Sequence, residues 1–229
     1  MHTIRLSEES DLPSILEISN WAALNTPANF AIEPETLESW QRDYRATRER
    51  HPWLVAVGVG DPLSLEGEGR GEGGAQVVDT RSSTREVAGD KPTARPSPLT
   101  PSLGGRGDQI VGFAKASPWK GRCAYLWSAE VTVYVHPARH GRGIGTALYA
   151  RLIDILRAQG YRSLVGGITL PNAASVALHE SFGFRRVALF EKIGWKFDRW
   201  HDVGYWELLL GDPAAAPGPI RPVREVIGA

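Results

Sequence analysis

The chain has 229 residues, and its 26 basic and 26 acidic side chains give a formal net charge of zero. A neutral chain has no overall attraction to nucleic acid or to an anionic membrane, so we expect neither as a partner. The single cysteine, Cys123, excludes an intrachain disulfide, favours a reducing compartment and is expected to be a small buried side chain. The N-terminus lacks the features of a signal peptide, and no apolar run reaches the roughly 18 residues of a membrane span. We therefore expect a cytoplasmic protein.

The N-terminal part predicts two strands with two helices between them. The first helix has apolar residues at helical spacing, with Ser10 or Asp11 as the expected N-cap. In the second helix Pro34 suits the first position, and Trp40 and Tyr44 fall on one face. The expected segments are 3–6 and 53–59 for the strands and 10–24 and 34–50 for the helices.

Residues 60–108 differ in composition from the rest of the chain. They contain no aromatic residue and are rich in Gly, Pro, Ser and charged side chains, so they bury too little apolar surface to offset the entropy of ordering. Strand-like sequence lies on both sides, over 53–59 and 109–117. A linker between two domains would require the first 59 residues to fold alone, which is marginal at that size. We predict a flexible insertion within one domain, 1–211.

The remaining elements follow in a regular order. A long strand precedes a helix that should end at Gly160, and a second helix should begin near Asn172 and end at Gly183. The expected segments are strands 124–135, 163–168, 185–193 and 203–210, helices 143–160 and 172–183, and a loosely attached Pro-rich tail, 212–229. This order predicts an α/β (α+β) fold with most strands in one sheet.

The stretch "HGRGIGTAL", 140–148, places three glycines directly before a helix. Unpaired amides and the helix dipole make such an N-terminus an anion site, and glycines let a phosphate approach the backbone. A dinucleotide-binding motif would need an acidic residue where Val165 stands, and a P-loop would need a lysine after the last glycine. The pyrophosphate loop of acyl-CoA N-acyltransferases, Gln/Arg-x-x-Gly-x-Gly/Ala, does fit, with His140 at its first position. The alternative is that the glycines serve only close strand–helix packing.

Further stretches resemble the GNAT superfamily, in the branch of phosphinothricin and methionine sulfone/sulfoximine N-acetyltransferases. They are "NFAIEPET", "RERHPWLVA", "SPWKGRCAYLWSAEVTVYVHP", "ITLPNAASVALHESFGF" and "WHDVGYWEL". The resemblance implies a central mixed, mostly antiparallel sheet flanked by helices. It also implies acetyl-CoA as co-substrate, a small-molecule amine as acceptor, and a homodimer.

The resemblance also implies a set of residues that bind acetyl-CoA. Amides of the strand before the glycine loop would hold the pantetheine arm and polarise the acetyl carbonyl. The loop would hold the pyrophosphate, and a residue at the start of the next helix, which is also a candidate N-cap, would contact the arm. These residues are Val133, Tyr134, Val135, Gly141, Arg142, Gly143, Ile144, Gly145, Thr146 and Asn172.

Two side chains are candidates for proton transfer. Glu130 is a carboxylate in an otherwise apolar and aromatic strand, where burial would raise its pKa, and the resembling branch has its proposed base there. His179 occupies the position where many GNAT proteins carry a general-acid tyrosine. The alternatives are an outward-facing strand residue and a histidine packed at a helix surface. The sequence around His179 has no zinc-binding spacing, so no metal is expected.

For the acceptor, the resemblance implies a small amino acid held by Lys120 and Arg122, with Phe30 and Glu33 in the acceptor loop. Lys120 and Arg122 could instead be solvated surface charges. The tryptophans, including Trp119, Trp195, Trp200 and Trp206, are expected in the core and at interfaces.

The leading hypothesis is acetyl-CoA-dependent acetylation of an amino acid such as phosphinothricin or methionine sulfoximine. Acetylation of another amine (a peptide N-terminus, a polyamine or an antibiotic) and coenzyme A binding without turnover stay open.

Overall fold

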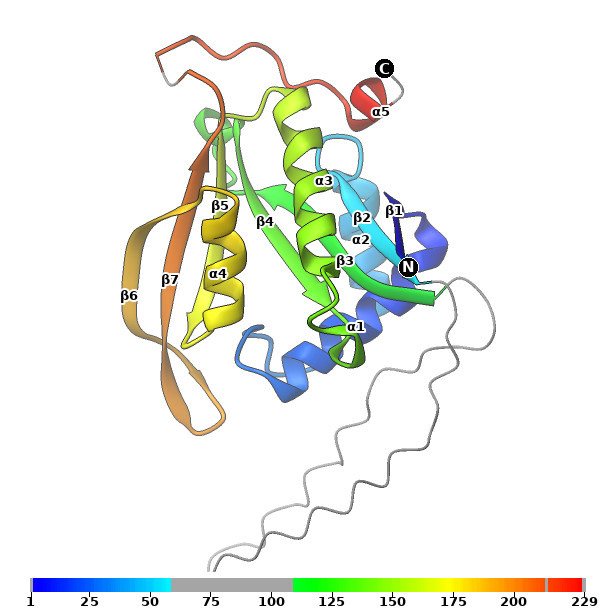
Figure 1. The fold of residues 1–229 in the computed structure, drawn as a ribbon, viewed down its shortest axis with the longest axis vertical. Coiled ribbons are helices and arrows are strands. Elements are labelled where there is room, and N and C mark those ends of the chain that lie inside the picture. Colours follow the sequence, from blue (N-terminus) through cyan, green and yellow to red (C-terminus); the bar gives the residue numbers. More distant parts are fainter. Residues whose placement is uncertain (1, 59–108, 213, 228–229) are drawn as a thin grey trace, which may run out of the picture. The chain divides into compact units, whose positions relative to one another are not determined.

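A computed structural model describes residues 2–58, 109–212 and 214–227, and these contain one seven-stranded sheet in the order β1-β2-β3-β4-β5-β7-β6 (Figure 1). Neighbouring strands are antiparallel except for β4 and β5, which are parallel. The sheet is thus mixed and mostly antiparallel, as predicted. The strands are β1 (His2–Leu6), β2 (Trp53–Gly58), β3 (Gln109–Pro118), β4 (Ser128–Val135), β5 (Ser163–Leu170), β6 (Arg185–Lys196) and β7 (Arg199–Leu209).

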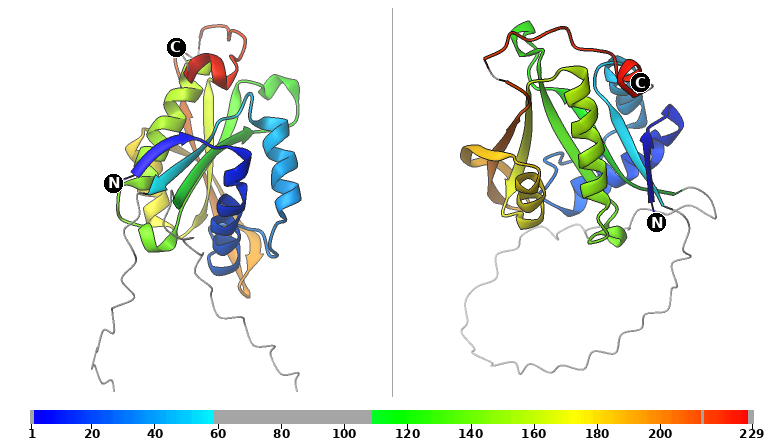
Figure 2. Two further views of the ribbon diagram at one scale, coloured as in Figure 1. Left: turned by 90° about the vertical axis from the view of Figure 1, so that its right-hand side faces the viewer. Right: turned by 45° about the horizontal axis from the view of Figure 1, so that its top comes forward.

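Helices cover both faces of the sheet and form two hydrophobic clusters (Figure 2). On one face α1 and α2 pack with Trp53, Val55 and Phe113 of the sheet. On the other face α3 packs against alternate residues of the same strands, such as Leu54 and Ala114. This division follows from the alternation of side chains along a strand. The helices are α1 (Leu12–Asn25), α2 (Leu37–Thr47), α3 (Ile144–Gln159), α4 (Ala173–Ser181) and α5 (Val223–Ile227).

The ends of the helices show where local sequence was decisive. Gly160 caps α3 with a φ of 98°, which favours glycine, and Asn172 caps α4, both as predicted. The helix α2 begins at Leu37, not at Pro34, because the Thr36 side chain accepts a hydrogen bond from the Ser39 amide.

Three other expectations need correction. A 3-10 turn over Cys123–Tyr125 precedes β4, so that strand begins at Ser128 rather than at 124. Cys123 lies in this turn and is exposed, not buried. The first helix begins at Leu12 rather than at 10, because residues 9–11 form a 3-10 turn. Asp11 is the N-cap residue of α1, one of the two that were predicted, and its carboxylate accepts hydrogen bonds from Arg5 and from the Glu8 amide.

The Pro-rich tail is docked against the domain, contrary to the expectation of loose attachment. Its helix α5 buries Val223 in the cluster beneath α3. The Gln159 side chain donates to the Arg221 carbonyl at 2.8 Å, and the Trp127 indole donates to the Gly218 carbonyl at 2.6 Å. Further hydrogen bonds run from the Arg221 and Val223 amides to the Gln159 and Glu49 carbonyls, so a segment that composition alone describes as a tail has several long-range contacts with the domain.

The predicted insertion, 60–108, lies outside the described residues, and its flexibility stays a prediction. The strands on its two sides, β2 and β3, are antiparallel neighbours, as expected. None of the described helices is both long and apolar enough to span a bilayer.

Candidate active site

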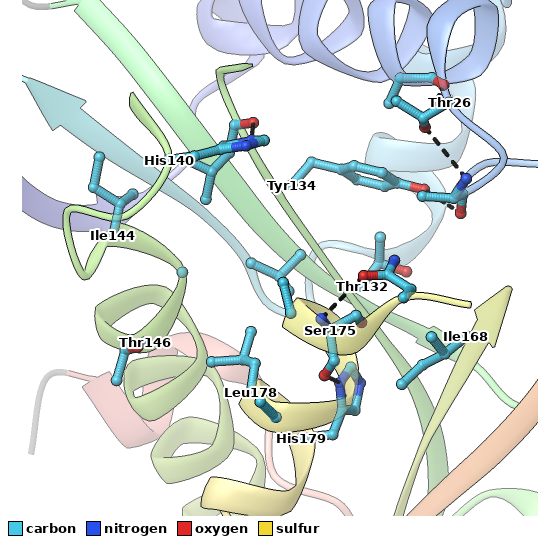
Figure 3. Close-up of a pocket in the computed structure, with 18 of the residues that line it drawn as sticks. Thr26, Thr132, Tyr134, His140, Ile144, Thr146, Ile168, Ser175, Leu178 and His179 are labelled. Carbon is cyan, nitrogen blue, oxygen red and sulfur yellow. Dashed lines mark hydrogen bonds between the residues drawn. The ribbon is translucent and has the colours of Figure 1, made fainter. Parts of the chain in front are cut away.

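A cleft of about 630 Å³ opens where β4 and β5 separate (Figure 3). The two strands pair only through Ser128–Glu130 and Ser163–Val165. Beyond Glu130, residues of both strands line the cleft together with the N-terminal ends of α3 and α4 and part of α1. A parallel pair that ends after three residues leaves the backbone groups of β4 on this edge without a ladder partner, so they can bind a ligand.

The glycine loop forms one wall of the cleft. Gly141 and Gly143 both have a φ of 73°, and a Cβ added at either would meet nothing within 4 Å. Glycine is therefore favoured at both positions by the backbone conformation, and the space beside the loop is open. Gly143 precedes the first residue of α3, so amides of the first helical turn face this space. The loop is a suitable cradle for a diphosphate.

His140 closes the loop onto the preceding strand. Its Nε2 donates to the Val135 carbonyl at 2.9 Å, across the 3-10 turn of residues 137–139. The side chain at the motif's unusual first position thus holds the loop in place. Arg142 is exposed and is not among the residues that line the cleft.

The start of α4 forms the opposite wall. Asn172 lines the cleft, and its side-chain oxygen accepts the Ser175 amide at 3.1 Å. The capping role predicted for Asn172 is confirmed, while its contact with a cofactor arm stays a prediction. The other predicted cofactor residues that line the cleft are Val133, Tyr134, Val135, Gly141, Gly143, Ile144, Gly145 and Thr146.

His179 belongs to the same helix, and its buried side chain lines the cleft (Figure 3). Its Nδ1 donates to the Ser175 carbonyl at 2.7 Å, because a carbonyl can only accept. Its Nε2 lies 2.7 Å from the hydroxyl of the fully buried Tyr149, and a neutral imidazole must accept there. Burial lowers the pKa of His179 and so favours this neutral form. Both ring nitrogens are therefore engaged.

Glu130 stands at the junction of this cleft with a second pocket. Burial raises the pKa of the Glu130 carboxyl, and the nearby ammonium groups of Lys120 and Lys115 oppose that rise. Gly167 on β5 leaves room beside it, since a Cβ there would lie 3.8 Å from Glu130 Oε1. A partly desolvated carboxylate that faces two connected cavities is suited to proton transfer between their occupants.

The second pocket, of about 320 Å³, lies between the sheet and the helices α1 and α2. Its floor includes Lys115, Glu130 and Thr132, and its roof includes Phe30 and Trp40. Of the predicted acceptor residues only Phe30 lines it. Glu33, Lys120 and Arg122 are exposed and line neither cavity. Those three roles stay predictions.

Six further residues that were not predicted from the sequence also line this pocket: Lys115, Glu35, Asp43, Thr132, Thr169 and Tyr205. A signal existed for Lys115, because it is the one charged residue within β3, as Glu130 is within β4. Trp40 was expected on one face of the second helix. Its side chain is buried in the core, and part of it also lines the pocket.

A buried lysine fixes the loop that roofs the second pocket. Lys196, on β6, donates to the backbone carbonyls of Ala23, Asn29 and Ala31. Phe30, in the same loop, packs so closely on Gly194 that a Cβ there would overlap its ring. The loop between α1 and α2 is thus held against the β6–β7 hairpin.

Comparison with known proteins agrees with this arrangement. Residues 78–184 match the family described as "Acetyltransferase (GNAT) family". The chain is 32% identical, over 97% of its length and 95% of the relative's, to a phosphinothricin N-acetyltransferase of Streptomyces viridochromogenes. It is 29% identical, over 94% of its length and 98% of the relative's, to an L-methionine sulfoximine/L-methionine sulfone acetyltransferase of Pseudomonas aeruginosa.

A solved structure has the same fold. The phosphinothricin acetyltransferase of Sinorhizobium meliloti in complex with AcCoA superposes with a TM-score of 0.69 at 26% identity, over 95% of this chain and 93% of that one. Among the described residues no group of three or more His, Cys, Asp or Glu side chains is arranged to hold a metal ion.

The family match and the two relatives together show that the chain is an acyltransferase of the GNAT family, in the group that contains the phosphinothricin and methionine sulfoximine/sulfone N-acetyltransferases.

Proposed function

We propose that the protein transfers the acetyl group of acetyl-CoA to the amino group of a small amino acid or analogue, such as phosphinothricin or methionine sulfone. The observation that carries the proposal is the position of Glu130 between a long cleft with a diphosphate cradle and a smaller charged pocket. The relatives named for these acceptors support the choice of acceptor class.

In this proposal the larger cleft binds acetyl-CoA, which supplies an activated acetyl thioester. The amides of α3 and the loop from Gly141 to Thr146 bind the diphosphate, and Asn172 contacts the arm. The free edge of β4 at Val133–Val135 binds the pantetheine amides and polarises the acetyl carbonyl.

Glu130 is the general base of the proposed reaction. It takes a proton from the acceptor's ammonium group, which frees the nitrogen lone pair to bond to the acetyl carbon as the carbon–sulfur bond breaks. A carboxyl whose pKa is raised by burial is better matched to this task than an ordinary glutamate. The leaving thiolate keeps the bonding electron pair and takes up the second proton, which the acceptor nitrogen loses as it becomes an amide, while Glu130 returns the first proton to water.

We assign His179 to positioning rather than to protonation of that thiolate. Its Nδ1 proton is held by Ser175, and its Nε2 would have to receive the Tyr149 proton before it could give one away. Burial raises the pKa of Tyr149 well above its usual range, which opposes that transfer.

Replacement of Tyr149 by Phe tests this assignment. We expect unfolding to become about 1–3 kcal/mol easier, because Nε2 of His179 is left buried without a donor, while kcat stays within about threefold. Thermal denaturation and steady-state kinetics measure both, with Tyr125→Phe, an exposed tyrosine, as control. A hundredfold loss of kcat at unchanged stability would instead make the Tyr149–His179 pair a proton source.

Lys196→Met tests the loop that roofs the acceptor pocket. Since Lys196 donates to three carbonyls, two of them in that loop, we expect the KM for the acceptor to rise about tenfold, which corresponds to the loss of about one charge-assisted hydrogen bond between the protein and the acceptor. The KM for acetyl-CoA should stay within about twofold. Lys192→Met, on the same strand but exposed, is the matched control. Equal increases in both KM values would contradict a role confined to the acceptor side.

The proposed function itself is tested by an amine screen with acetyl-CoA and a thiol reagent. Thiol release with phosphinothricin, methionine sulfoximine or methionine sulfone is the expected result. Release only with a polyamine, an antibiotic or a peptide N-terminus would change the acceptor class. If coenzyme A binds but no amine causes thiol release, the protein binds the cofactor without transferring its acetyl group.

We further propose a homodimer built on β6, which is an edge strand of the described sheet. That strand exposes Val187, Leu189, Phe190, Ile193 and Trp195, an apolar set that favours a protein contact over solvent. Trp195 and Trp200 were expected in the core or at interfaces, and their exposure in the single chain suits an interface, whereas Trp206 is in the core. Sedimentation of the purified chain measures the mass, and a monomer at micromolar concentration would contradict the proposal.

A further inference from the structure

The second pocket contains a lysine, Lys115, that forms no direct ion pair with any described residue. Lys115 lies in the middle of β3, and its ammonium nitrogen is 4.6 Å from the ring centroid of Trp40 and 4.4 Å from that of Trp53. It makes no hydrogen bond or ion pair with any residue that the structure describes. Two indole faces stabilise a cation but supply no hydrogen-bond acceptor. The ammonium's donors are therefore available to whatever enters the pocket.

The register of the sheet places this cation near the proposed base. Lys115 is directly opposite Thr132 on β4, and Glu130 is two residues away on the same face of that strand. Diagonal neighbours of this kind have Cα atoms about 7–8 Å apart. Both side chains line the second pocket. A compact molecule there can meet the ammonium and the carboxylate at once.

We propose that Lys115 binds the carboxylate of the acceptor and so selects zwitterionic amino acids over simple amines. The inference rests on the proposed acetyl transfer and assigns it a specificity-determining residue. In this arrangement the acceptor's carboxylate faces Lys115 while its ammonium group faces Glu130.

The charges around the pocket support the choice of a zwitterion. Glu35 and Asp43 also line it, and with Glu130 they form an acidic surround for the acceptor's ammonium group. Burial lowers the pKa of Lys115, and these three carboxylates oppose that fall. A bound carboxylate restores to the ammonium the hydrogen-bond acceptor that it lost on leaving water. Lys120 and Arg122, the cations predicted from sequence, are outside the pocket and have access to water instead.

The experiment compares an amino acid with its amide as acceptor. In the wild type we expect kcat/KM for L-methionine sulfone to exceed that for L-methionine sulfone amide by about 10- to 100-fold, the range of one charge-assisted hydrogen bond. This first comparison needs no variant. Lys115→Met should raise the KM for the acid by a similar factor and leave the amide's KM within about threefold.

Further variants separate the alternatives. Lys115→Arg should keep part of the preference for the acid, because it keeps the charge. Arg151→Met, an exposed residue of α3 on the other face of the sheet, is the control that should change neither KM. If Lys120→Met or Arg122→Ala removes the preference and Lys115→Met does not, the exposed pair is the carboxylate site and the proposal is wrong.

Failure of the proposal and failure of the proposed function are distinguishable. A wild type that acetylates the acid and the amide equally well is an acetyltransferase without a carboxylate site at Lys115. A wild type that acetylates neither, while it binds acetyl-CoA, contradicts the acceptor class itself.

Discussion

Glu130→Gln is expected to lower kcat by about 100- to 1000-fold, within the range for loss of a general base, while the KM for acetyl-CoA changes by less than about threefold. Glutamine keeps the shape and one acceptor oxygen of the side chain but cannot take a proton. The loss should therefore fall on the chemical step rather than on binding. Steady-state kinetics with a thiol reagent measures both constants. The matched control is Glu207→Gln, a half-buried glutamate of β7 that lines neither cavity.

The pH dependence of the wild type gives a second readout for Glu130. The base must be ionised to act, so activity falls as the pH falls through its pKa. Burial raises the pKa of Glu130 above 4.5, so this acidic limb should lie at a higher pH than an exposed glutamate would give. The residual activity of Glu130→Gln should lack that limb. An identical limb in both proteins would assign it to another group.

The same substitution should make the fold more stable at neutral pH. A carboxyl whose pKa is raised on folding contributes stability that is fully present below its unfolded pKa, near 4.5, and is lost as the pH rises through the folded value. At pH 7.5 the ionised Glu130 thus destabilises the fold, and glutamine removes that cost. We expect Glu130→Gln to melt at a higher temperature than the wild type at pH 7.5 but not at pH 4.5. A lower melting temperature at pH 7.5 would mean that the carboxylate has structural partners in the fold.

The cleft proposed for acetyl-CoA could be predicted from the sequence because its parts are contiguous. Glycines before an amphipathic helix specify a backbone with positive φ at Gly141 and Gly143, and a helix N-terminus is an anion site wherever it occurs. The asparagine cap of α4 is an equally local signal. Such features depend on a few neighbouring residues, so they can be identified without the tertiary structure.

The pocket proposed for the acceptor could not be predicted in the same way because distant segments build it. Phe30 reaches it from a loop, Trp40 from α2, Lys115 from β3 and Tyr205 from β7. Only the register of the sheet and the docking of α1 and α2 bring them together. The resemblance implies that Lys120 and Arg122, in a turn, bind the acceptor, and that role stays a prediction, whereas the cation that lines this pocket is the half-buried Lys115 in the adjoining strand. A single charged residue in an otherwise apolar strand indicates a functional side chain. This signal pointed to Glu130 in β4, and the same signal was present for Lys115 in β3.

The second large effect is expected for Gly145→Asp, in the first turn of α3. A Cβ at this position would make only ordinary contacts, at 3.6 Å with Val135 and 3.7 Å with Leu178, so the fold can accept it. An acidic residue in the first turn is favourable to a helix by about 0.3–1 kcal/mol, and the melting temperature should not fall. The aspartate nevertheless puts a negative charge where the diphosphate is expected. Repulsion of about 3 kcal/mol, for charges about 5 Å apart at an effective dielectric constant of about 20, corresponds to a loss of more than 100-fold in affinity.

Calorimetric titration with coenzyme A measures this loss, and Gly145→Asn is the control of nearly equal size without the charge. If Asp weakens binding far more than Asn, the amides at the start of α3 hold an anionic part of the ligand. Equal losses in the two variants would show that the added side chain blocks the cleft by its volume. Unchanged affinity in both would mean that the diphosphate is bound elsewhere. The comparison of Gly145→Asp with Gly145→Asn thus separates electrostatic recognition by the helix N-terminus from steric fit. The added charge is expected to stabilise α3 and at the same time to weaken the binding of coenzyme A.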